Sequence, residues 1–406
     1  MNKIPNGWKE KKLKYIAEIT SSKRIYEYEY VDSGIPFYRG KEITALKNNQ
    51  KIENFIYISE KRYNELKEKY GVPSKYDILI TAVGTVGNAY TIEDDKPFYF
   101  KDGNLLWLKN IKEYPKFVEY LFECNKNVLL NNFFGSVQHA LTISRLENLT
   151  FYFPPLDEQK RIASALSKID AYLENTIKLI EEKERFKRGI AKKLLTCKEG
   201  ENIPEARFKG FEDEWMEVAI SKIGTIITGN TPSTKNESFW NGNNIWVTPT
   251  DIKQKYISNS ERKLTDDGLK KSRKLPANTL LITCIASIGK NAILKCEGAC
   301  NQQINAIIPN KNYNVDFLYY LFENEKSYLK FKAPQSVIKI MSKSEFSKLV
   351  FKFPLLEEQE KIGGYLSLLD AEIDNLKKQK ELIKEMKRGA MQKLLSGEVR
   401  LVDNYD

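Results

Sequence analysis

The stretch Phe151-Tyr-Phe-Pro-Pro-Leu-Asp-Glu-Gln159 returns 200 residues later as Phe351-Lys-Phe-Pro-Leu-Leu-Glu-Glu-Gln359. Lys187-Arg-Gly189 returns in the same way as Lys387-Arg-Gly389. Without any gap, residues 151–198 and 351–398 are identical at 20 of 48 positions, which is far above chance. The chain is therefore a tandem of two related halves.

Each repeated stretch opens a long amphipathic pattern. Apolar residues recur at spacings of three and four, with charged and amide residues between them, which predicts a helix of about 40 residues, roughly 60 Å long. Each helix begins acidic and ends basic, so an antiparallel pair would be complementary at both ends. We therefore predict an antiparallel coiled coil between 157–196 and 357–396. Its seam is expected at Ile162, Leu166, Ile169, Leu173, Ile177, Ile180, Ile362, Leu366, Leu369, Ile373, Leu376 and Ile383.

The segments before the helices mix short β-like runs with short helices, which predicts globular α/β units. Buried strands are expected at 77–81 and 279–283, each followed by a Gly-bearing turn, and short helices at 117–123 and 317–323. The expected organisation is an α/β pseudo-two-fold tandem. It comprises a first globular unit (1–153), a first long helix (154–198), a second globular unit (199–353), a second long helix (354–400) and a tail (401–406).

Composition limits the class of protein. The 406 residues carry 65 Lys and Arg against 54 Asp and Glu, a net charge of +11, which favours a polyanionic partner, nucleic acid before membrane. No apolar run approaches the roughly 20 residues of a membrane span, and the N-terminus lacks a signal-peptide core. We expect a cytoplasmic protein without membrane contact, whose five cysteines are reduced thiols.

Catalytic patterns are missing. The one histidine, His139, has Lys339 as its counterpart, and no P-loop or adenine-methyltransferase motif is present. Cys296 and Cys300 with Cys284 could be a zinc cluster, but the first half has no equivalent, so buried thiols are favoured. The turn Gly84-Thr-Val-Gly87 could hold a phosphate, although a strand-to-strand turn is favoured. We expect no catalytic residue and no metal site.

Several ordered motifs accompany the repeat. They are Arg207-Phe-Lys-Gly-Phe-Glu-Asp-Glu-Trp215, Gly229-Asn-Thr-Pro-Ser233, Phe239-Trp-Asn-Gly-Asn-Asn-Ile-Trp246, Thr250-Asp-Ile252, Ile288-Gly-Lys290 and Asn301-Gln-Gln303. With the two repeated helix starts, the chain resembles the specificity (S) subunit of Type I restriction–modification systems over essentially its full length. The first globular unit departs more from the family pattern, as expected if it reads a different DNA sequence.

The resemblance implies a non-catalytic subunit that recognises a bipartite, asymmetric sequence in double-stranded DNA, one part per recognition domain. It also implies that the helices set the spacer and dock two methyltransferase (M) subunits, with restriction (R) subunits in the full complex. No cofactor is expected on this chain. S-adenosylmethionine and ATP with Mg²⁺ are expected on the partner subunits.

DNA contacts are expected from loops, where basic residues bind phosphate and amide or aromatic residues read bases. The candidates are Lys23, Arg24, Tyr38, Arg39, Lys41, Gln138, His139, Thr231, Lys235, Trp240, Lys253, Gln302, Gln303 and Lys339. Two alternatives remain: a coiled-coil scaffold without a DNA role, and a stand-alone DNA-binding regulator. The scaffold would not explain the charge or the two diverged globular units.

Overall fold

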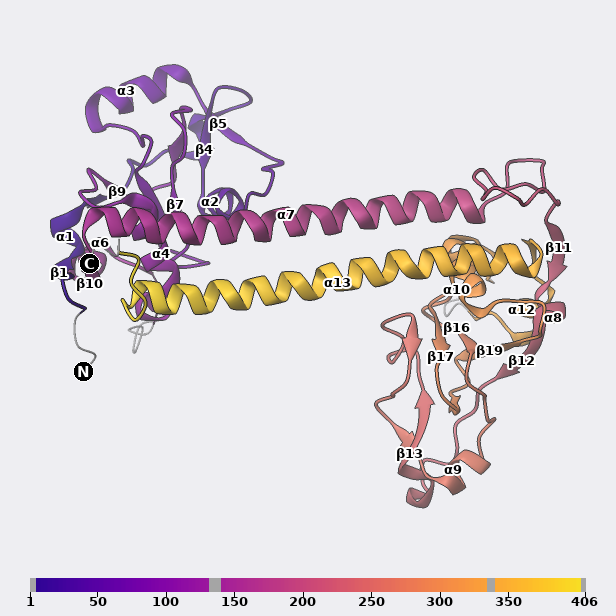
Figure 1. Cartoon of the computed structure of the whole chain (residues 1–406). Coiled ribbons are helices and arrows are strands. Elements are labelled where there is room, and N and C mark those ends of the chain that lie inside the picture. Colours follow the sequence, from indigo (N-terminus) through magenta and orange to yellow (C-terminus); the bar gives the residue numbers. More distant parts are fainter. Residues whose placement is uncertain (1–4, 131–139, 334–339, 403–406) are drawn as a thin grey trace. The chain divides into compact units, whose positions relative to one another are not determined.

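The structure is a computed structural model that describes residues 5–130, 140–333 and 340–402. These residues form two compact units: unit 1 draws on residues 1–176 and 379–406, and unit 2 on residues 177–378. Each long helix contributes one part to each unit. The two units are described separately below (Figure 1).

The elements follow nearly the same order in both halves of the chain. In the first half they are β1 (Lys9–Lys12), α1 (Leu13–Ile16), β2 (Glu18–Thr20), η1 (Glu27–Glu29), β3 (Tyr30–Val31), β4 (Ile35–Tyr38), α2 (Gly40–Lys47), β5 (Ile56–Ile58), α3 (Glu60–Tyr70), β6 (Ile78–Thr81), β7 (Ala89–Thr91), β8 (Tyr99–Phe100), β9 (Leu105–Lys109), α4 (Pro115–Cys124), α5 (Lys126–Leu130), α6 (Ile143–Asn148), β10 (Thr150–Phe153) and α7 (Leu156–Leu195).

The second half repeats this order with small changes. Its elements are β11 (Met216–Ala219), α8 (Ile220–Ile223), β12 (Gly224–Thr228), η2 (Glu237–Phe239), β13 (Trp240–Val247), β14 (Tyr256–Ile257), β15 (Lys263–Leu264), α9 (Asp266–Lys270), β16 (Thr279–Thr283), β17 (Asn291–Leu294), β18 (Gly298–Cys300), β19 (Ile304–Pro309), α10 (Val315–Asn324), α11 (Lys326–Lys332), α12 (Lys343–Lys348), β20 (Val350–Phe353) and α13 (Leu356–Leu395).

The sheets are small and mostly antiparallel. Unit 1 has sheets in the strand orders β2-β9-β6-β7, β3-β5-β4-β8 and β1-β10. Unit 2 has β12-β19-β16-β17-β14, β15-β13-β18 and β11-β20. One parallel pair recurs: β4 with β8 in unit 1, and β13 with β18 in unit 2. The α/β tandem predicted from the sequence is confirmed.

The repeated glutamine explains why the helix starts are so similar. In unit 1 the buried Gln159 amide donates to Pro154 O at 2.9 Å and accepts from the Tyr114 backbone N–H at 2.9 Å. In unit 2 Gln359 makes the same two bonds, to Pro354 O and from Asn314 N–H. Each glutamine thus joins the first turn of a long helix to the segment before α4 or α10.

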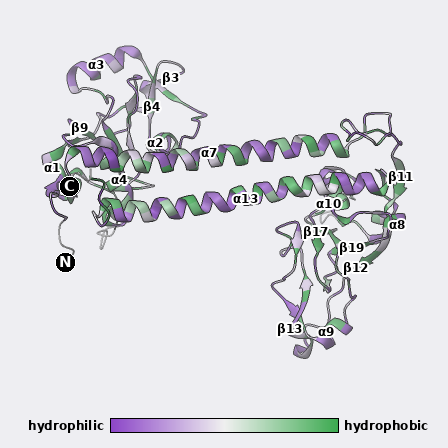
Figure 2. Ribbon diagram, viewed as in Figure 1, coloured by the Kyte–Doolittle hydropathy of each residue, from purple (hydrophilic) through white to green (hydrophobic). Residues whose placement is uncertain are grey.

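The long helices are antiparallel within each unit. In unit 1, Ile162 and Leu166 at the start of α7 share a core with Met391 and Leu394 at the end of α13. In unit 2 the start of α13, including Leu366, packs in the same way with the end of α7. Figure 2 shows hydrophobic and hydrophilic residues alternating along both helices. The predicted antiparallel pairing is confirmed.

Most of the expected seam is buried or half-buried. Ile162, Leu166, Ile180, Ile362, Leu366, Leu369, Ile373 and Ile383 are buried, while Ile169, Leu173 and Leu376 are half-buried. Ile177 departs from the expectation because it is 38% exposed, and the neighbouring Thr176 is buried instead. Thr176 can be buried because its hydroxyl donates to Tyr172 O, four residues earlier on the same helix, at 2.8 Å.

Candidate nucleic-acid interface

Three loops converge at the same place in each unit. In unit 1 the loop after β2 packs on the loop after β8: Ser21 Oγ donates to Leu105 O at 2.9 Å and Ser22 Oγ to Phe100 O at 2.7 Å. In unit 2 the loop after β12 does the same, with Gly229 N–H on Ile304 O and Asn230 N–H on Cys300 O, both at 3.0 Å. The third loop follows the parallel strand β4 or β13. We call this convergence the loop end of each unit.

Gly229 is required for this convergence. A Cβ at this position would lie 2.2 Å from the backbone oxygens of both Cys300 and Asn301. No side chain can be accommodated there without moving the backbone. The motif Gly229-Asn-Thr-Pro-Ser233 therefore has a structural basis, because glycine allows the loop after β12 to lie directly on the loop after β18.

The loop end of unit 1 is rich in charged groups. Arg24 is exposed and its Nε lies 2.9 Å from Asp102 Oδ2, an ion pair that raises the pKa of Arg24. Lys23 is also exposed, and its ammonium group lies 4.9 Å from the Tyr70 ring centroid. Tyr38 ends β4, is half-buried and stacks on Phe98 at 4.7 Å.

Arg39 and Lys41 share one carboxylate. Glu42 is 2% exposed and accepts from the Arg39 backbone N–H at 2.8 Å and from the Arg39 guanidinium at 2.8 and 3.2 Å. Lys41 Nζ lies 3.6 Å from the same carboxylate and is mainly exposed. Burial acts to raise the pKa of Glu42, but its bonds to Arg39 outweigh burial and lower it. The trio keeps one net positive charge at the start of α2.

The loop end of unit 2 carries hydroxyl and amide groups instead. Thr231 Oγ1 donates to Gln302 Oε1 at 2.6 Å, and both residues are exposed. Gln303 is half-buried, and its Oε1 accepts from Asn301 Nδ2 at 2.9 Å. Two predicted residues, Thr231 and Gln302, are therefore brought into contact across 71 positions of sequence.

Trp240 requires a correction. It is 7% exposed, its indole N–H donates to Ser233 O at 3.1 Å, and its ring packs edge-on against Trp246 at 5.0 Å. Arg262 covers its face at 3.8 Å. The side chain is part of a small core and is not available to contact a base. Lys235 and Lys253 are both exposed, on loops before η2 and after β13.

Gln138, His139 and Lys339 lie outside the described residues. The residues that follow these segments join the turn after β6 or β16: Leu141 N–H donates to Ala82 O, and Met341 N–H to Cys284 O, both at 2.9 Å. The turn itself joins two antiparallel strands, β6 to β7, as favoured from the sequence for Gly84-Thr-Val-Gly87. Thr81 fixes this turn by donating to Thr85 O at 2.5 Å.

Sequence reasoning missed the residues that hold the loops together. Asn230 is the centre in unit 2: its side chain donates to Lys271 O at 3.0 Å and accepts from Arg273 N–H at 2.8 Å, while its backbone carbonyl accepts from the Trp246 indole. Arg273 also donates to Thr228 O at 2.6 Å. Only the Gly229-Asn dipeptide, a turn signal, could have indicated this position.

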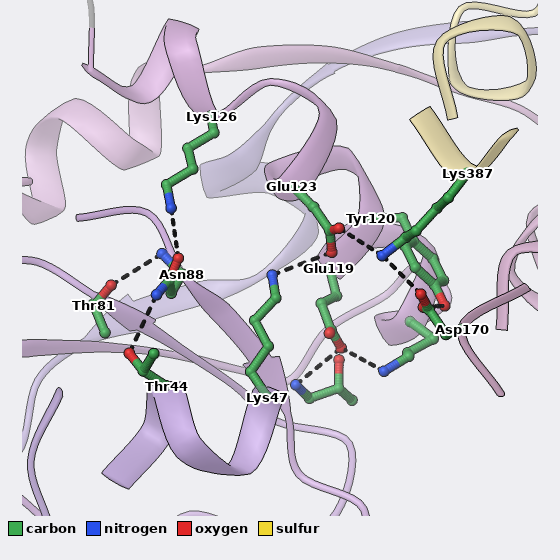
Figure 3. A network of polar contacts seen from close by, with 12 residues as sticks. Thr44, Lys47, Thr81, Asn88, Glu119, Tyr120, Glu123, Lys126, Asp170 and Lys387 are labelled. Carbon is green, nitrogen blue, oxygen red and sulfur yellow. Dashed lines mark hydrogen bonds and ion pairs between the residues drawn. The ribbon is translucent and has the colours of Figure 1, made fainter. Parts of the chain in front are cut away.

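Polar contacts link the turn of unit 1 to α2, and α2 to the long helices (Figure 3). Lys126 donates to Asn88 Oδ1 at 2.6 Å, and Asn88 in turn donates to Thr44 Oγ1 at 3.2 Å. On the other side of the network, Lys47 and Lys387 both pair with Glu123, at 3.2 and 2.6 Å.

The network ends on α7. Lys387 also pairs with Asp170 at 2.8 Å, and the Tyr120 hydroxyl donates to Asp170 at 2.6 Å. Burial acts to raise the pKa of Glu123, but the two lysines outweigh burial and lower it. The ionised network therefore holds α4, and through it the sheet, in place on the helices.

Unit 2 repeats the helix-facing part of the network. Tyr320 donates to Asp370 at 2.5 Å, and Lys187 forms a hydrogen-bonded ion pair with Asp370. Lys255, which has no counterpart in the Figure 3 network, adds bonds to Ser367 at 2.6 Å and Asp316 at 2.6 Å. The tyrosine–aspartate–lysine group is therefore the same in both units, whereas the surrounding contacts differ.

The cysteines do not form a site in the described part of the chain. Cys284 and Cys300 are buried, and burial raises the pKa of their thiols to about 11 and about 12. Among the described residues, no group of three or more His, Cys, Asp or Glu side chains is placed to hold a metal ion. Over the same residues, none of the helices has the length and apolar character that a bilayer crossing needs.

The architecture is a tandem of two related α/β units, each packed on both long helices. The chain matches the family described as Type I restriction modification DNA specificity domain twice, over residues 5–182 and 212–385. Because these matches cover more than half of the chain, the protein belongs to this family.

The chain is similar to named members of the family. A putative type I restriction enzyme MjaX specificity subunit from Methanocaldococcus jannaschii is 25% identical over 426 residues, covering 99% of this chain and 96% of that protein. The type I restriction enzyme MjaIX specificity subunit of the same organism is 36% identical over 180 residues. That second match spans 43% of this chain and less than half, 42%, of the relative.

Solved structures show the same fold. The S subunit of a Type-I restriction-modification system from M. genitalium aligns with a TM-score of 0.58 and 17% identity, covering 97% of each chain. A chain solved in work on complex assembly and conformational transition of the type I R-M system aligns with a TM-score of 0.62 and 16% identity, covering 98% of this chain and 100% of that chain.

Proposed function

We propose that this chain is the DNA-recognition subunit of a Type I restriction–modification complex, and that each loop end reads one part of a two-part DNA sequence. The observation that carries the proposal is the contrast between the two loop ends. The same loops meet in both units, through serine hydroxyls in unit 1 and backbone N–H groups in unit 2, yet the loop end of unit 1 presents Arg24, Arg39 and Lys41, whereas that of unit 2 presents Thr231 and Gln302. A shared framework with different polar groups is what two readers of different sequences require.

The recognition domains are proposed to comprise residues 1–153 and 199–353, with spacer helices at 154–198 and 354–400 and a tail at 401–406. This chain would carry no catalytic residue. Methyltransferase subunits with S-adenosylmethionine would modify the DNA, and restriction subunits with ATP and Mg²⁺ would join in the full complex. Because its substrate is chromosomal or invading double-stranded DNA, the complex would act in the cytoplasm.

The two long helices are proposed to set the unread spacer between the half-sites. Each has 40 residues, about 60 Å at 1.5 Å per residue, whereas B-DNA rises about 3.4 Å per base pair. Inserting one heptad into both helices adds roughly 10 Å, or about three base pairs. Sequencing of methylated sites should show a correspondingly longer spacer, and an unchanged spacer would count against this role.

The methyltransferase subunits are proposed to dock where Lys-Arg-Gly recurs. The lysine of each copy is engaged within the chain, Lys187 by Asp370 and Lys387 by Asp170. The glycine of each copy has open space beside it, because a Cβ at Gly189 or Gly389 would meet nothing within 4 Å. Glycine inside a helix costs about 1 kcal/mol relative to alanine, so its presence at both positions needs another reason.

A partner helix that crosses each long helix closely over the glycine supplies that reason. The neighbouring Arg188 and Arg388 are exposed and, within the described residues, have no ion-pair partner. Such a surface fits an acidic segment of the partner. Because one copy lies in each unit, the stoichiometry would be two methyltransferase subunits per chain.

The docking can be tested by counting subunits. Light scattering on the co-expressed complex should give two methyltransferase subunits for wild type, one for Gly189→Leu and none for Gly189→Leu with Gly389→Leu. Gly364→Leu is the matched control, because Gly364 also lies on α13 with open space at its Cβ but has Ser164 as its counterpart. Two bound subunits in the double variant would exclude this docking surface.

The recognition function itself is tested by co-expression with the cognate methyltransferase subunit, followed by sequencing of methylated bases. We expect one bipartite motif with two different halves. A soluble complex without any bipartite methylated motif would overturn the proposal and leave a scaffold or a stand-alone regulator as the alternatives.

A further inference from the structure

Equivalent positions in the two units hold two different side-chain pairs. Asp102 and Gln302 both lie two residues beyond a strand of the recurring parallel pair, β8 or β18. Their surroundings correspond as well, because Lys101 N–H donates to Tyr38 O, and Asn301 N–H to Val247 O, both at 2.9 Å. In each unit the side chain at this position bonds to the loop that follows β2 or β12.

In both pairs a short side chain holds a longer polar side chain, but the longer side chain differs between the units. In unit 1, Asp102 holds Arg24 through Nε at 2.9 Å. In unit 2, Thr231 holds Gln302 through Oε1 at 2.6 Å. Arg24 follows by one residue the position that corresponds to Thr231, since Ser22 and Asn230 make the equivalent contacts before them. Each pair therefore has one long polar side chain and one short partner that orients it.

We propose that these pairs are the base-reading elements of the two domains, Arg24 for a guanine in one half-site and Gln302 for an adenine in the other. This inference rests on the proposed recognition function and names the bases that it reads. A guanidinium has five N–H donors, so the contact to Asp102 leaves donors for O6 and N7 of guanine. The Gln302 oxygen keeps a second lone pair for adenine N6–H, and its amide N–H can donate to N7.

Exposure and preorganisation favour these residues over other candidates at the loop ends. The Arg24 side chain is 65% exposed, whereas that of Arg39 is 28% exposed. Both Nε and Nη2 of Arg39 already donate to the Glu42 carboxylate. Gln302 is exposed, whereas Gln303 is half-buried. Fixing the reading group before binding lowers the entropy lost on binding, so a held side chain discriminates better than a free one.

The test uses the co-expressed complex with its methyltransferase and sequencing of methylated bases. Gln302→Ala should relax one adenine position in one half-site, and Arg24→Ala one guanine position in the other. The discrimination lost at that position is expected to be about 5- to 150-fold. Thr231→Val keeps the glutamine but removes its holder, so it should weaken discrimination at the same adenine by a smaller factor.

Controls separate base reading from general DNA affinity and from folding. Lys235→Ala, at an exposed lysine, should lower methylation at all sites without changing the motif. Melting temperatures of all variants should match wild type, because the substituted side chains lie on the surface.

Three results are decisive. Relaxation confined to one base in one half-site, different for the two variants, supports the proposal. A wild-type bipartite motif that stays unchanged in both variants, or changes in both halves at once, overturns it while leaving the recognition function intact. A wild-type complex without a bipartite motif refutes the recognition function itself.

Discussion

Removing the Lys387 ammonium group should destabilise unit 1 specifically. Lys387 is 15% exposed and pairs with Glu123 at 2.6 Å and with Asp170 at 2.8 Å. Losing one charged hydrogen bond costs about 1.5–3 kcal/mol, but both carboxylates are 27–36% exposed and can recover part of this from water. We expect Lys387→Met to lower the free energy of unfolding by about 2 kcal/mol.

The pH dependence of this loss follows from the pKa shifts. Burial acts to raise the pKa of Glu123 and to lower that of Lys387, but in each case the paired charges outweigh burial and shift it the other way. The contribution of Glu123 is present above its ordinary pKa and is lost as pH falls through the lowered value. That of Lys387 is present below its ordinary pKa and is lost as pH rises through the raised value. The difference between variant and wild type should be constant near neutral pH and shrink in acid.

The assay combines urea unfolding with hydrogen exchange measured on α4, the helix that carries Glu123. The matched control is Lys384→Met, one turn away on the same helix, where the ammonium is 49% exposed and, among the described residues, pairs only with the exposed Glu381. That substitution should cost less than about 0.5 kcal/mol. Equal effects of the two substitutions on stability and on exchange in α4 would refute the reasoning.

Three further outcomes are expected. Glu158→Gln should destabilise unit 1 by about 2 kcal/mol in urea unfolding at neutral pH, since the buried carboxylate pairs with Arg400 at 2.8 Å. Arg400 lowers the pKa of Glu158 despite burial, so this difference should vanish as pH falls through that lowered value. At pH 8 the buried thiols of Cys284 and Cys300, with pKa values near 11 and 12, should react with iodoacetamide far more slowly in the native protein than in urea, as mass spectrometry would show. Trp240→Ala should lower the free energy of unfolding of unit 2 by about 3 kcal/mol in thermal melts, with a smaller loss for Trp240→Phe, which retains most of the buried ring; a fully stable Trp240→Ala protein would contradict its place in the core.

The regular parts of the fold were predictable because local pattern determines them. The long helices were expected at 157–196 and 357–396 and occur at 156–195 and 356–395. The strand expected at 279–283 has those limits. The spacing of apolar residues along a single helix or strand is sufficient for such predictions, because it shows directly which residues are buried.

The loop ends were only partly predictable because their partners are far apart in sequence. Thr231 and Gln302 were both expected at the interface, but their mutual hydrogen bond depends on sheet pairing between β12 and β19. Trp240 was misplaced because its Asn- and Gly-rich surroundings are typical of a loop. In the structure those residues belong to β13, with Trp240 packed against Leu264 and Trp246.

The division of the chain into units has a consequence for the order of folding during synthesis. Unit 2 is made from one continuous segment, residues 177–378, whereas unit 1 also needs residues 379–406. Met391, Leu394 and Leu395 complete the core of unit 1, and Arg400 pairs with Glu158 in its first helix turn. The N-terminal recognition domain is therefore translated first, but it lacks part of its core until the last helix has left the ribosome. A premature stop codon within α13 should thus damage the domain at the opposite end of the sequence.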